Sequence, residues 1–242
     1  MKFENTEVWG FEHAIRGMRN PLNSWDKSDS CYLTINEIAG HPCNDGLQKE
    51  FVIGENDLKL MQKLIRAGSE HRKFLRQIFV SVDITAPLYW WKEFDTYKIG
   101  TTANSTSTMH KLASTPITLE CFETDDFNDE LLIQQYPNGN RKPFEDALRY
   151  SIYDLIYVLE RLRVKYLETK DKKYWKELIR WLPESWIQKR TITMNYENLL
   201  MMYRQRKSHK LNEWSGLDNS ELPNYISWIK SLPYADELIC IE

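Results

Sequence analysis

RQIFVSVDITAPLYWWKEF, from Arg76 to Phe94, is the stretch that decides the fold. In its first half apolar residues alternate with other types, and the apolar positions are Ile78, Val80, Val82 and Ile84. Alternation with a period of two predicts a β-strand with one buried face. Pro87 then suits the first turn of a helix, and no breaker follows before Gly100, so we expect a helix over LYWWKEFDTYK. A strand that passes directly into a helix predicts a mixed α/β protein.

The segments before and after this stretch predict different kinds of structure. Upstream, apolar residues at helical spacing predict a short amphipathic helix that begins at Asn56, its expected N-cap, and stops at Gly68. Downstream, TTANSTSTMH at 101–110 is polar and rich in hydroxyls, so we expect a loop. The first 50 residues carry the weakest pattern, with turn residues around Asn20-Pro21 and from Gly40 to Gly46.

The second half of the chain predicts mainly helix. A long helix is expected from Phe144 to about Glu168, and a second one, KKYWKELIRW, ends before Leu182-Pro183. The β-branched segment RTITM is typical of a strand, and Asn195 follows it as the expected N-cap of another helix. A last helix is expected over Leu222 to Leu232. We therefore expect an α/β (α+β) fold with more helix than strand.

Length and composition narrow the class of protein. The chain has 242 residues, of which 42% are hydrophobic and 28% charged, and neither a linker nor a repeat divides it. These values are typical of a globular protein, and we expect one domain over residues 1–242. The 32 basic and 35 acidic residues give a net charge of -3, which argues against nucleic acid as the main partner. Four cysteines are too few for a disulfide scaffold. With no apolar stretch of signal-peptide or membrane-span length, we expect a cytoplasmic protein.

Common catalytic motifs are missing from the sequence. The phosphate-binding patterns G-x-G-x-x-G and G-x-x-x-x-G-K do not occur, nor does the hydrolase pattern G-x-S-x-G. Cys31, His41 and Cys43 are close in sequence, but they lack paired ligand spacing and a fourth ligand, so we expect no metal site. The basic run from Arg204 to Lys210 suits a solvated helix end, with contact to phosphate as the alternative.

The stretch from Asp57 to Lys111 resembles the central segment of the flavin-dependent thymidylate synthases. In that family an amphipathic helix ending in Gly precedes an alternating strand, and Ala-Pro then opens a further helix. Here LMQKLIRAG, IFVSVDIT and Ala86-Pro87 stand in the same order. Lys92-Glu93-Phe94 is similar to the family's Arg-Gln-aromatic step, which assigns Glu93 to substrate binding. EHRKF at 70–74 replaces the family's flavin stretch, Thr-Pro-Phe-Glu-His.

The signature of this family, Arg-His-Arg-x7-Ser, has changed. Thr96-Tyr97-Lys98 stands where the family has Arg-His-Arg, and it leaves Lys98 as the basic contact to the cofactor. Asn104 and Ser107 match retained positions, as a cofactor contact and as the catalytic serine, with one additional residue between Lys98 and Ser107. The family's second arginine, just past this serine, polarises the pyrimidine. Met109 stands there in this chain and has neither a charge nor a hydrogen-bond donor.

A second block resembles the same family. Leu182-Pro183 is followed after twelve residues by Asn195, and Arg206 comes eleven residues later. The family has this spacing, and its arginine binds the nucleotide phosphate. SHKLNEW, which begins at Ser208, is similar to the family's Ser-His-x-Gln-x-Glu. The resemblance thus implies substrate binding by Arg206 and Arg180, and cofactor binding by Asn195 and His209.

The resemblance implies a fold, a chemistry and an assembly. The fold would be a single domain with a small, mostly antiparallel sheet packed with several helices. The chemistry would be methyl and hydride transfer to a pyrimidine deoxynucleotide such as dUMP, with FAD as cofactor and NADPH and a folate as further reactants. The assembly would be a homotetramer.

The changed signature leaves two functions open. A divergent flavoenzyme with an altered substrate would show such changes. An inactive relative that acts as a nucleotide-binding or assembly protein would show them as well, because the substitutions concentrate in the signature while the framework remains. A weaker alternative is nucleic-acid binding through residues 204–210, which a filter-binding assay with DNA would test by its dependence on salt.

Overall fold

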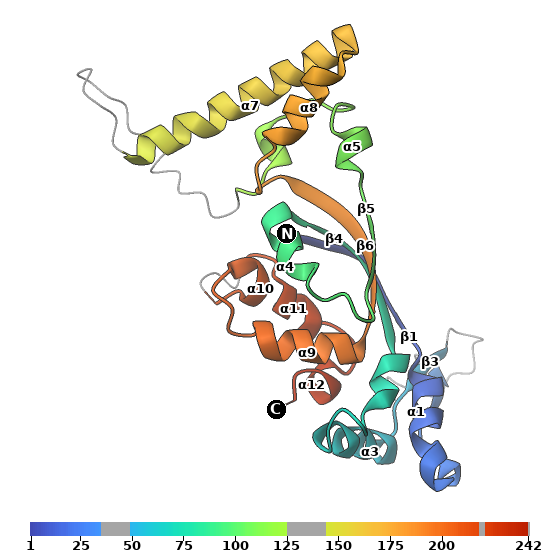
Figure 1. Ribbon diagram of the computed structural model, residues 1–242. Coiled ribbons are helices and arrows are strands. Elements are labelled where there is room, and N and C mark those ends of the chain that lie inside the picture. Colours follow the sequence, from blue (N-terminus) through green and yellow to red (C-terminus); the bar gives the residue numbers. More distant parts are fainter. Residues whose placement is uncertain (35–48, 125–143, 218–220, 242) are drawn as a thin grey trace. The chain divides into compact units, whose positions relative to one another are not determined.

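The computed structural model describes residues 1–34, 49–124, 144–217 and 221–241 (Figure 1). The strands are β1 (Lys2–Trp9), β2 (Cys31–Thr34), β3 (Lys49–Val52), β4 (Phe79–Pro87), β5 (Thr102–Ser105) and β6 (Ile187–Asn195). The longer helices are α1 (Phe11–Arg19), α3 (Glu55–Arg66), α4 (Leu88–Phe94), α7 (Phe144–Thr169), α8 (Lys172–Arg180) and α9 (Tyr196–Arg206). Shorter helices are α5 (Thr108–Lys111), α10 (Asn212–Ser215), α11 (Tyr225–Lys230) and α12 (Ala235–Leu238), with 3-10 turns η1 (Asn20–Leu22), η2 (Trp25–Lys27), η3 (Lys73–Gln77) and η4 (Leu119–Cys121).

Two sheets combine with these helices. One has four strands in the order β1-β4-β6-β5. The other is the antiparallel hairpin of β2 and β3, in which Cys31 lies opposite Val52 and Thr34 opposite Lys49. The expected mixed fold of helices and antiparallel sheet is confirmed. No helix in the described part of the chain combines the length and the apolar character needed to cross a bilayer.

The contacts gather into two compact units. The first contains residues 1–2, 84–96 and 104–190, and the second contains residues 3–83, 97–103 and 191–242. The chain passes between them within β4 and β6, so each of these strands contributes to both units. The expectation of one domain over the whole chain stays a prediction.

The first unit has an apolar cluster around α7 and α8, which pack on each other. The fully or nearly buried members of this cluster are Leu112, Ile117, Phe122, Leu159 and Leu178. Trp90, Trp91 and Phe94 of α4 are buried as well, and the Trp91 indole nitrogen donates a hydrogen bond to the Gln188 carbonyl at 2.9 Å. The aromatic side chains after Pro87 thus hold α4 on the strand β6.

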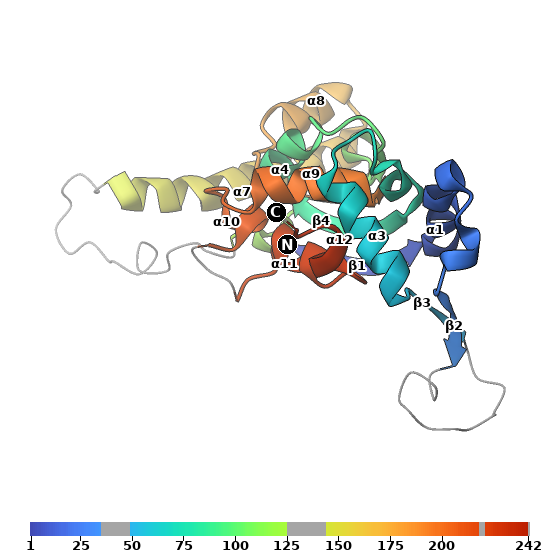
Figure 2. The same cartoon turned by 90° about the horizontal axis from the view of Figure 1, so that it is seen from below.

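The second unit buries the apolar face of β4 among helices. Ile78, Val80 and Val82 are fully buried, as the alternating pattern predicts. α11 contacts α9, α10 and α12, and these helices form one group (Figure 1). α3 contacts both α1 and α12 (Figure 2). The buried members of this group include large aromatic side chains, namely Tyr196, Trp214, Tyr225 and Trp228.

Several expected boundaries differ from the structure. The segment expected to be a loop at 101–110 contains the edge strand β5 and the short helix α5. β5 has four exposed residues, so it lacks the apolar face that would have indicated a strand, and pairing with β6 creates it. The helix after Pro87 ends at Phe94 rather than near Gly100, because Thr96 donates its hydroxyl and its amide to the Glu93 carbonyl.

Other predicted elements agree with the structure to within a few residues, and one predicted stretch lies outside the described residues. α7, α8 and the Asn195 cap of α9 agree with their predicted positions. The last predicted helix, over Leu222 to Leu232, corresponds to the shorter α11, which ends with Ser231 as its C-cap, and α12 was not predicted. β6 begins at Ile187, three residues before the predicted strand. The turn residues from Gly40 to Gly46 fall outside the described residues.

Candidate functional site

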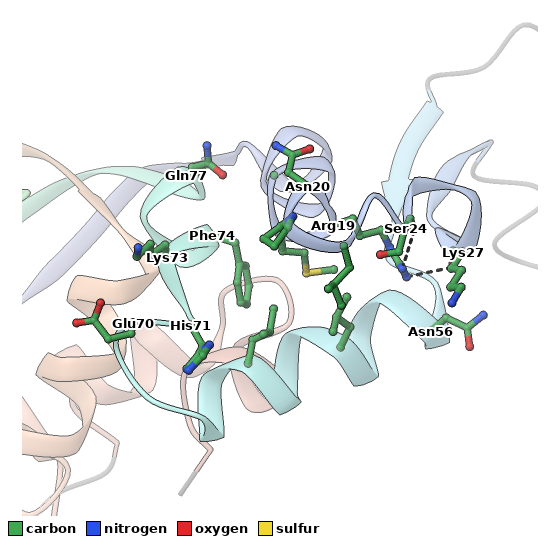
Figure 3. A pocket seen from close by; sticks show the side chains of 16 residues that line it. Arg19, Asn20, Ser24, Lys27, Asn56, Glu70, His71, Lys73, Phe74 and Gln77 are labelled. Atoms are coloured by element: carbon green, nitrogen blue, oxygen red, sulfur yellow. Dashed lines mark hydrogen bonds between the residues drawn. The ribbon is translucent and has the colours of Figure 1, made fainter.

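A cavity of about 1110 Å³ lies in the second unit among α1, η1, α3 and η3 (Figure 3). Its volume is slightly above the roughly 300–1,000 Å³ typical of ligand pockets. Apolar side chains form much of its wall, and they are Met18, Pro21, Leu22, Leu60, Leu64 and Phe74. Phe74 is 3% exposed and lies near the middle of the cavity in Figure 3. Such a wall suits the flat apolar part of a ligand.

Polar side chains occupy both sides of Phe74. Lys73, Glu70 and Gln77 lie on one side, and Ser24, Lys27 and Asn56 lie on the other (Figure 3). His71 lines the cavity beside Phe74. Lysine ammonium groups bind phosphate oxygens, and amide side chains offer both donors and acceptors. The cavity therefore combines an aromatic wall with cations spaced along it.

Four of the five residues in the segment 70–74 line the cavity, namely Glu70, His71, Lys73 and Phe74. The side chain of Arg72, which is 9% exposed, instead donates from Nε to Glu197 Oε1 at 3.0 Å. Glu197 belongs to the first turn of α9, where a carboxylate is also stabilised by the helix dipole. The buried ion pair thus fixes the wall segment to α9.

The opposite wall is held by the carboxylate of Asp57, which is fully buried in α3. Its Oδ1 accepts a hydrogen bond from Arg19 Nε at 2.6 Å. Its Oδ2 accepts from the hydroxyls of Ser28 (2.7 Å) and Ser30 (2.6 Å), and from the amides of Asp29 (3.2 Å) and Ser30 (3.1 Å). We call this set of residues, Arg19, Ser28, Asp29, Ser30 and Asp57, the Asp57 knot.

The contacts of the Asp57 knot stabilise the ionised form of the buried Asp57 carboxyl. Burial acts to raise the pKa of the Asp57 carboxyl, but the hydrogen bonds from Ser30, Ser28 and Arg19 and the charge of Arg19 outweigh it. The pKa therefore lies below its ordinary value. Arg19 also donates to the carbonyls of Ser24 and Lys27, both at 3.0 Å. These bonds shape the loop that carries Ser24 and Lys27 into the cavity wall.

Asp29 caps the N-terminus of α3. Its carboxylate accepts from the amides of Asn56 (2.8 Å) and Asp57 (3.1 Å), two amides that an α-helix leaves unpaired in its first turn. Asn56 is therefore not the N-cap, contrary to the sequence expectation. Gly54 holds the N-cap position, and a Cβ there would come within 2.2 Å of the Asp29 carboxyl group. Glycine is required at this position because the cap comes from a distant part of the chain.

A second polar cluster surrounds Arg206, in the last turn of α9. Arg206 Nε donates to the Tyr97 hydroxyl at 2.8 Å, and this hydroxyl donates to Gln205 Oε1 at 2.8 Å. The Arg206 guanidinium lies 4.8 Å from the Trp214 ring centre and 5.5 Å from that of Tyr97. These distances are typical of cation–π contacts. We call Tyr97, Gln205, Arg206 and Trp214 the Arg206 cluster.

The Arg206 cluster packs on buried aromatic side chains. Trp214 is fully buried and contacts the buried Tyr225 edge to face, with ring centres 5.1 Å apart. The His209 ring contacts the same indole at 6.2 Å, and His209 Nδ1 accepts from the Leu211 amide at 3.1 Å. Two residues assigned by the resemblance, Arg206 and His209, thus meet at Trp214.

The segment from Tyr97 to Gly100 is also fixed at its other end. Asn198 in the first turn of α9 donates its side-chain amide to the Ile99 carbonyl at 2.8 Å. Asn195 caps α9 by accepting from the Asn198 amide at 3.0 Å, and it is 8% exposed. Gly100 has a φ of 78° and packs against these two asparagines. Asn195 therefore has a structural role, and its cofactor role stays a prediction. Lys98 is exposed.

The remaining predicted site residues belong to the first unit. Glu93 lies half-buried in α4, Asn104 is exposed on the edge strand β5, and Ser107 accepts the Lys111 amide at the start of α5. Arg180 is exposed and forms an ion pair with Glu177 one turn earlier in α8. Met109 is 48% exposed, and its carbonyl accepts from the Trp175 indole at 3.1 Å. The roles that the resemblance assigns to these residues stay predictions.

Sequence reasoning missed the Asp57 knot, although one signal was present. Asp57, Met61 and Ile65 are four residues apart and share the buried face of α3, so an acidic residue stands on an apolar stripe. A carboxylate at such a place needs buried donors.

The sequence analysis also considered metal ligands. The described residues contain no group of three His, Cys, Asp or Glu placed to hold a metal ion. Cys31 is exposed, and His41 and Cys43 lie outside the described residues.

Comparisons with known proteins bear on the fold. No protein-family model and no curated protein sequence matches the chain. Among solved structures, the flavin-dependent thymidylate synthase ThyX from Helicobacter pylori, complexed with FAD and dUMP, is similar with a TM-score of 0.60 and 17% sequence identity. The similarity covers 99% of this chain and 98% of that one. Another structure of ThyX from this organism with FAD and dUMP gives a TM-score of 0.59 at 16% identity, with 99% and 97% covered.

These neighbours confirm the fold that the sequence resemblance implies. The chain has the fold of the flavin-dependent thymidylate synthases over nearly its whole length. Because the identity is low, the likeness concerns the fold alone, and function has to be argued from the residues of this chain.

Proposed function

We propose that this chain is a divergent flavin-dependent thymidylate synthase-like protein that binds FAD and a pyrimidine deoxynucleotide such as dUMP, for methyl and hydride transfer. One observation carries the proposal. The segment 70–74, which stands where the sequence resemblance places a flavin stretch, lines a cavity of about 1110 Å³. The fold around this cavity is one that binds FAD and dUMP in the Helicobacter pylori enzyme.

The residues of the cavity fit a flavin dinucleotide. Lys73 would hold the diphosphate, because an ammonium group binds phosphate oxygens through charge-assisted hydrogen bonds, and Lys27, on the other side of Phe74, would bind an oxygen at another part of the cofactor. Phe74 would contact a ring of the cofactor, and Asn20, Asn56 and Gln77 would supply hydrogen bonds to its polar edges. When bound, the flavin supplies the hydride. The protein's contribution is to orient the cofactor and to exclude water from its apolar wall.

Arg206 would bind the 5'-phosphate of the nucleotide. A guanidinium presents a planar fork of donors that matches two phosphate oxygens. The Arg206 cluster fixes that fork against an indole and a phenol ring. Lys98, Asn104, Asn195 and His209 as cofactor contacts, Glu93 and Arg180 as substrate contacts and Ser107 as the catalytic serine belong to the same proposal. So do NADPH and a folate as further reactants, a homotetramer and a cytoplasmic location.

A second function is favoured by Met109. The family's pyrimidine-polarising arginine is replaced there by a side chain without a donor. Removing one oriented donor from a dry site typically costs on the order of 10² to 10³ in rate. The chain could then bind its nucleotide without the standard reaction, as an inactive nucleotide-binding or assembly protein.

The absorbance spectrum of the purified protein tests flavin binding. We expect a flavin spectrum, either as purified or after titration with FAD. Lys73→Ala and Lys27→Ala should weaken FAD binding about tenfold each, because each loses a charge-assisted contact of about 1.5 kcal/mol. Lys176→Ala, at an exposed lysine of α8, is the matched control and should bind FAD as the wild type does. A protein that stays colourless with excess FAD would contradict the proposal.

Product formation separates the two functions. The protein would be supplied with FAD, NADPH, methylenetetrahydrofolate and dUMP, and the formation of dTMP would be measured. Turnover supports the enzyme. Bound FAD and dUMP without turnover supports the inactive relative.

A further inference from the structure

The Tyr97 hydroxyl contacts two neighbouring side chains of α9, Arg206 and Gln205. The Tyr97 hydroxyl accepts from Arg206 Nε and donates to Gln205 Oε1, both at 2.8 Å. A phenol has one donor and can accept at its oxygen, so these two bonds use its donor and one acceptor position. Tyr97 comes from a segment far away in sequence, and Asn198 fixes that segment by its bond to the Ile99 carbonyl.

The contacts restrict how the guanidinium can lie. Its five N–H groups share one plane, so a bond at Nε sets the direction of the remaining fork. The rings of Trp214 and Tyr97, at 4.8 and 5.5 Å, limit rotation of the group. The bond from Nε to Tyr97 therefore sets the plane of the guanidinium and the direction of its terminal nitrogens. A side-on approach through Nε would have to displace the phenol.

We propose that Tyr97 is a positioning residue that orients Arg206 for binding of the nucleotide phosphate. This inference rests on the proposed nucleotide site and adds a role that the sequence resemblance does not supply, since Tyr97 stands where the family has a histidine. The gain comes from pre-organisation. A free arginine side chain loses rotamer entropy when it binds, and a side chain already held in place loses less.

Calorimetric titration with dUMP tests this role in four proteins: wild type, Tyr97→Phe, Arg206→Ala and the double variant. Tyr97→Phe keeps the ring beside Arg206 and removes only the hydroxyl. We expect it to weaken dUMP binding about tenfold, which corresponds to about 1.4 kcal/mol. In the Arg206→Ala background the same change should alter binding by less than about twofold, because Tyr97 acts through Arg206. Tyr157→Phe, at a tyrosine 66% exposed on α7, is the matched control.

The outcomes separate this inference from the proposed function. If the wild type does not bind dUMP, the proposed nucleotide site fails and the positioning role fails with it. If the wild type binds and Tyr97→Phe binds equally well, only the positioning role is overturned. An equal loss from Tyr97→Phe in both backgrounds would also overturn it, since Tyr97 would then act on the ligand or on the fold.

A measurement without ligand covers the case in which Arg206→Ala abolishes detectable binding. The Nε–H signal of Arg206 can be assigned in an NMR spectrum by its loss in Arg206→Lys. We expect its hydrogen exchange to be at least about tenfold slower in the wild type than in Tyr97→Phe, because the hydroxyl protects this proton. Equal exchange rates in the two proteins would contradict the inference.

Discussion

Arg19 and Arg206 are held in different ways, although both lie in the second unit. Arg19 is 4% exposed, and it is bound to a carboxylate and two carbonyls within the Asp57 knot. Arg206 is half-buried, with a phenol hydroxyl at Nε and aromatic rings beside its plane. The partner at Nε of Arg19 is a carboxylate, which carries a negative charge, whereas the partner at Nε of Arg206 is a neutral phenol, which orients the guanidinium through a hydrogen bond. The first arrangement is suited to stability, and the second to binding an anion.

Removal of the Asp57 carboxylate should have the largest effect. Asp57→Ala leaves Arg19 buried without its counter-ion and several donors unpaired, so we expect the free energy of unfolding to fall by about 3–5 kcal/mol. Urea denaturation followed by circular dichroism would measure the loss. Asp154→Ala, at an exposed aspartate of α7, should change it by less than about 0.5 kcal/mol. Similar values for the two variants would show that the knot does not stabilise the fold.

Arg206 should affect binding rather than stability. Arg206→Ala should weaken dUMP binding about 10- to 100-fold, because a charge-assisted hydrogen bond contributes about 1.5–3 kcal/mol. The melting temperature should change little. Arg204→Ala, at an exposed arginine on the same helix, should leave dUMP binding within about twofold of the wild type. A large loss of stability in Arg206→Ala without a loss of binding would reverse the contrast between the two arginines.

The dependence of stability on pH sharpens the same contrast. The pKa of Asp57 is lowered in the folded protein, so its contribution is present above the unfolded pKa of about 3.9 and is lost as the pH falls through the folded pKa. Asp57→Asn lacks this titration. The difference in unfolding free energy between wild type and Asp57→Asn should therefore shrink by up to about 1.4 kcal/mol per pH unit below pH 4. A constant difference from pH 6 to pH 2 would exclude a charged Asp57.

The smallest expected effect concerns the cap of α9. Asn195→Ala removes a capping box and should lower the free energy of unfolding by about 1 kcal/mol. Asn104→Ala, at an exposed position of β5, should lower it by less than about 0.5 kcal/mol. FAD titration of both variants then separates capping from cofactor binding. Weaker FAD binding only in Asn104→Ala would leave Asn195 with a structural role alone.

Local patterns predicted those parts of the fold that depend on neighbouring residues. The alternation of Val80 and Val82 predicted β4, and Asn195 followed by Asn198 supplies a cap that is visible within four residues. The N-terminus of α3 could not be predicted in this way, because its cap, Asp29, lies 27 residues before the amide of Asn56. The strand β5 depends on its partner β6 rather than on its own composition.

The candidate site shows the same limit. The resemblance to the family in the spacing from Asn195 to Arg206 identified Arg206, and both residues belong to α9 and its N-cap. The contact between Arg206 and Tyr97 joins residues 109 positions apart, and no local pattern encodes it. The cavity likewise combines α1, α3 and η3, so its shape becomes visible only when these elements pack together.

The hydrogen bond between Ser30 and Gly54 bears on protein engineering. The Ser30 hydroxyl accepts the Gly54 amide at 3.0 Å, so the segment that leads into β2 and the segment that follows β3 are joined beside the Asp57 knot. None of the residues of these two strands lines the cavity. A peptide tag or a small domain inserted between Thr34 and Lys49 should therefore be tolerated without a change in FAD affinity.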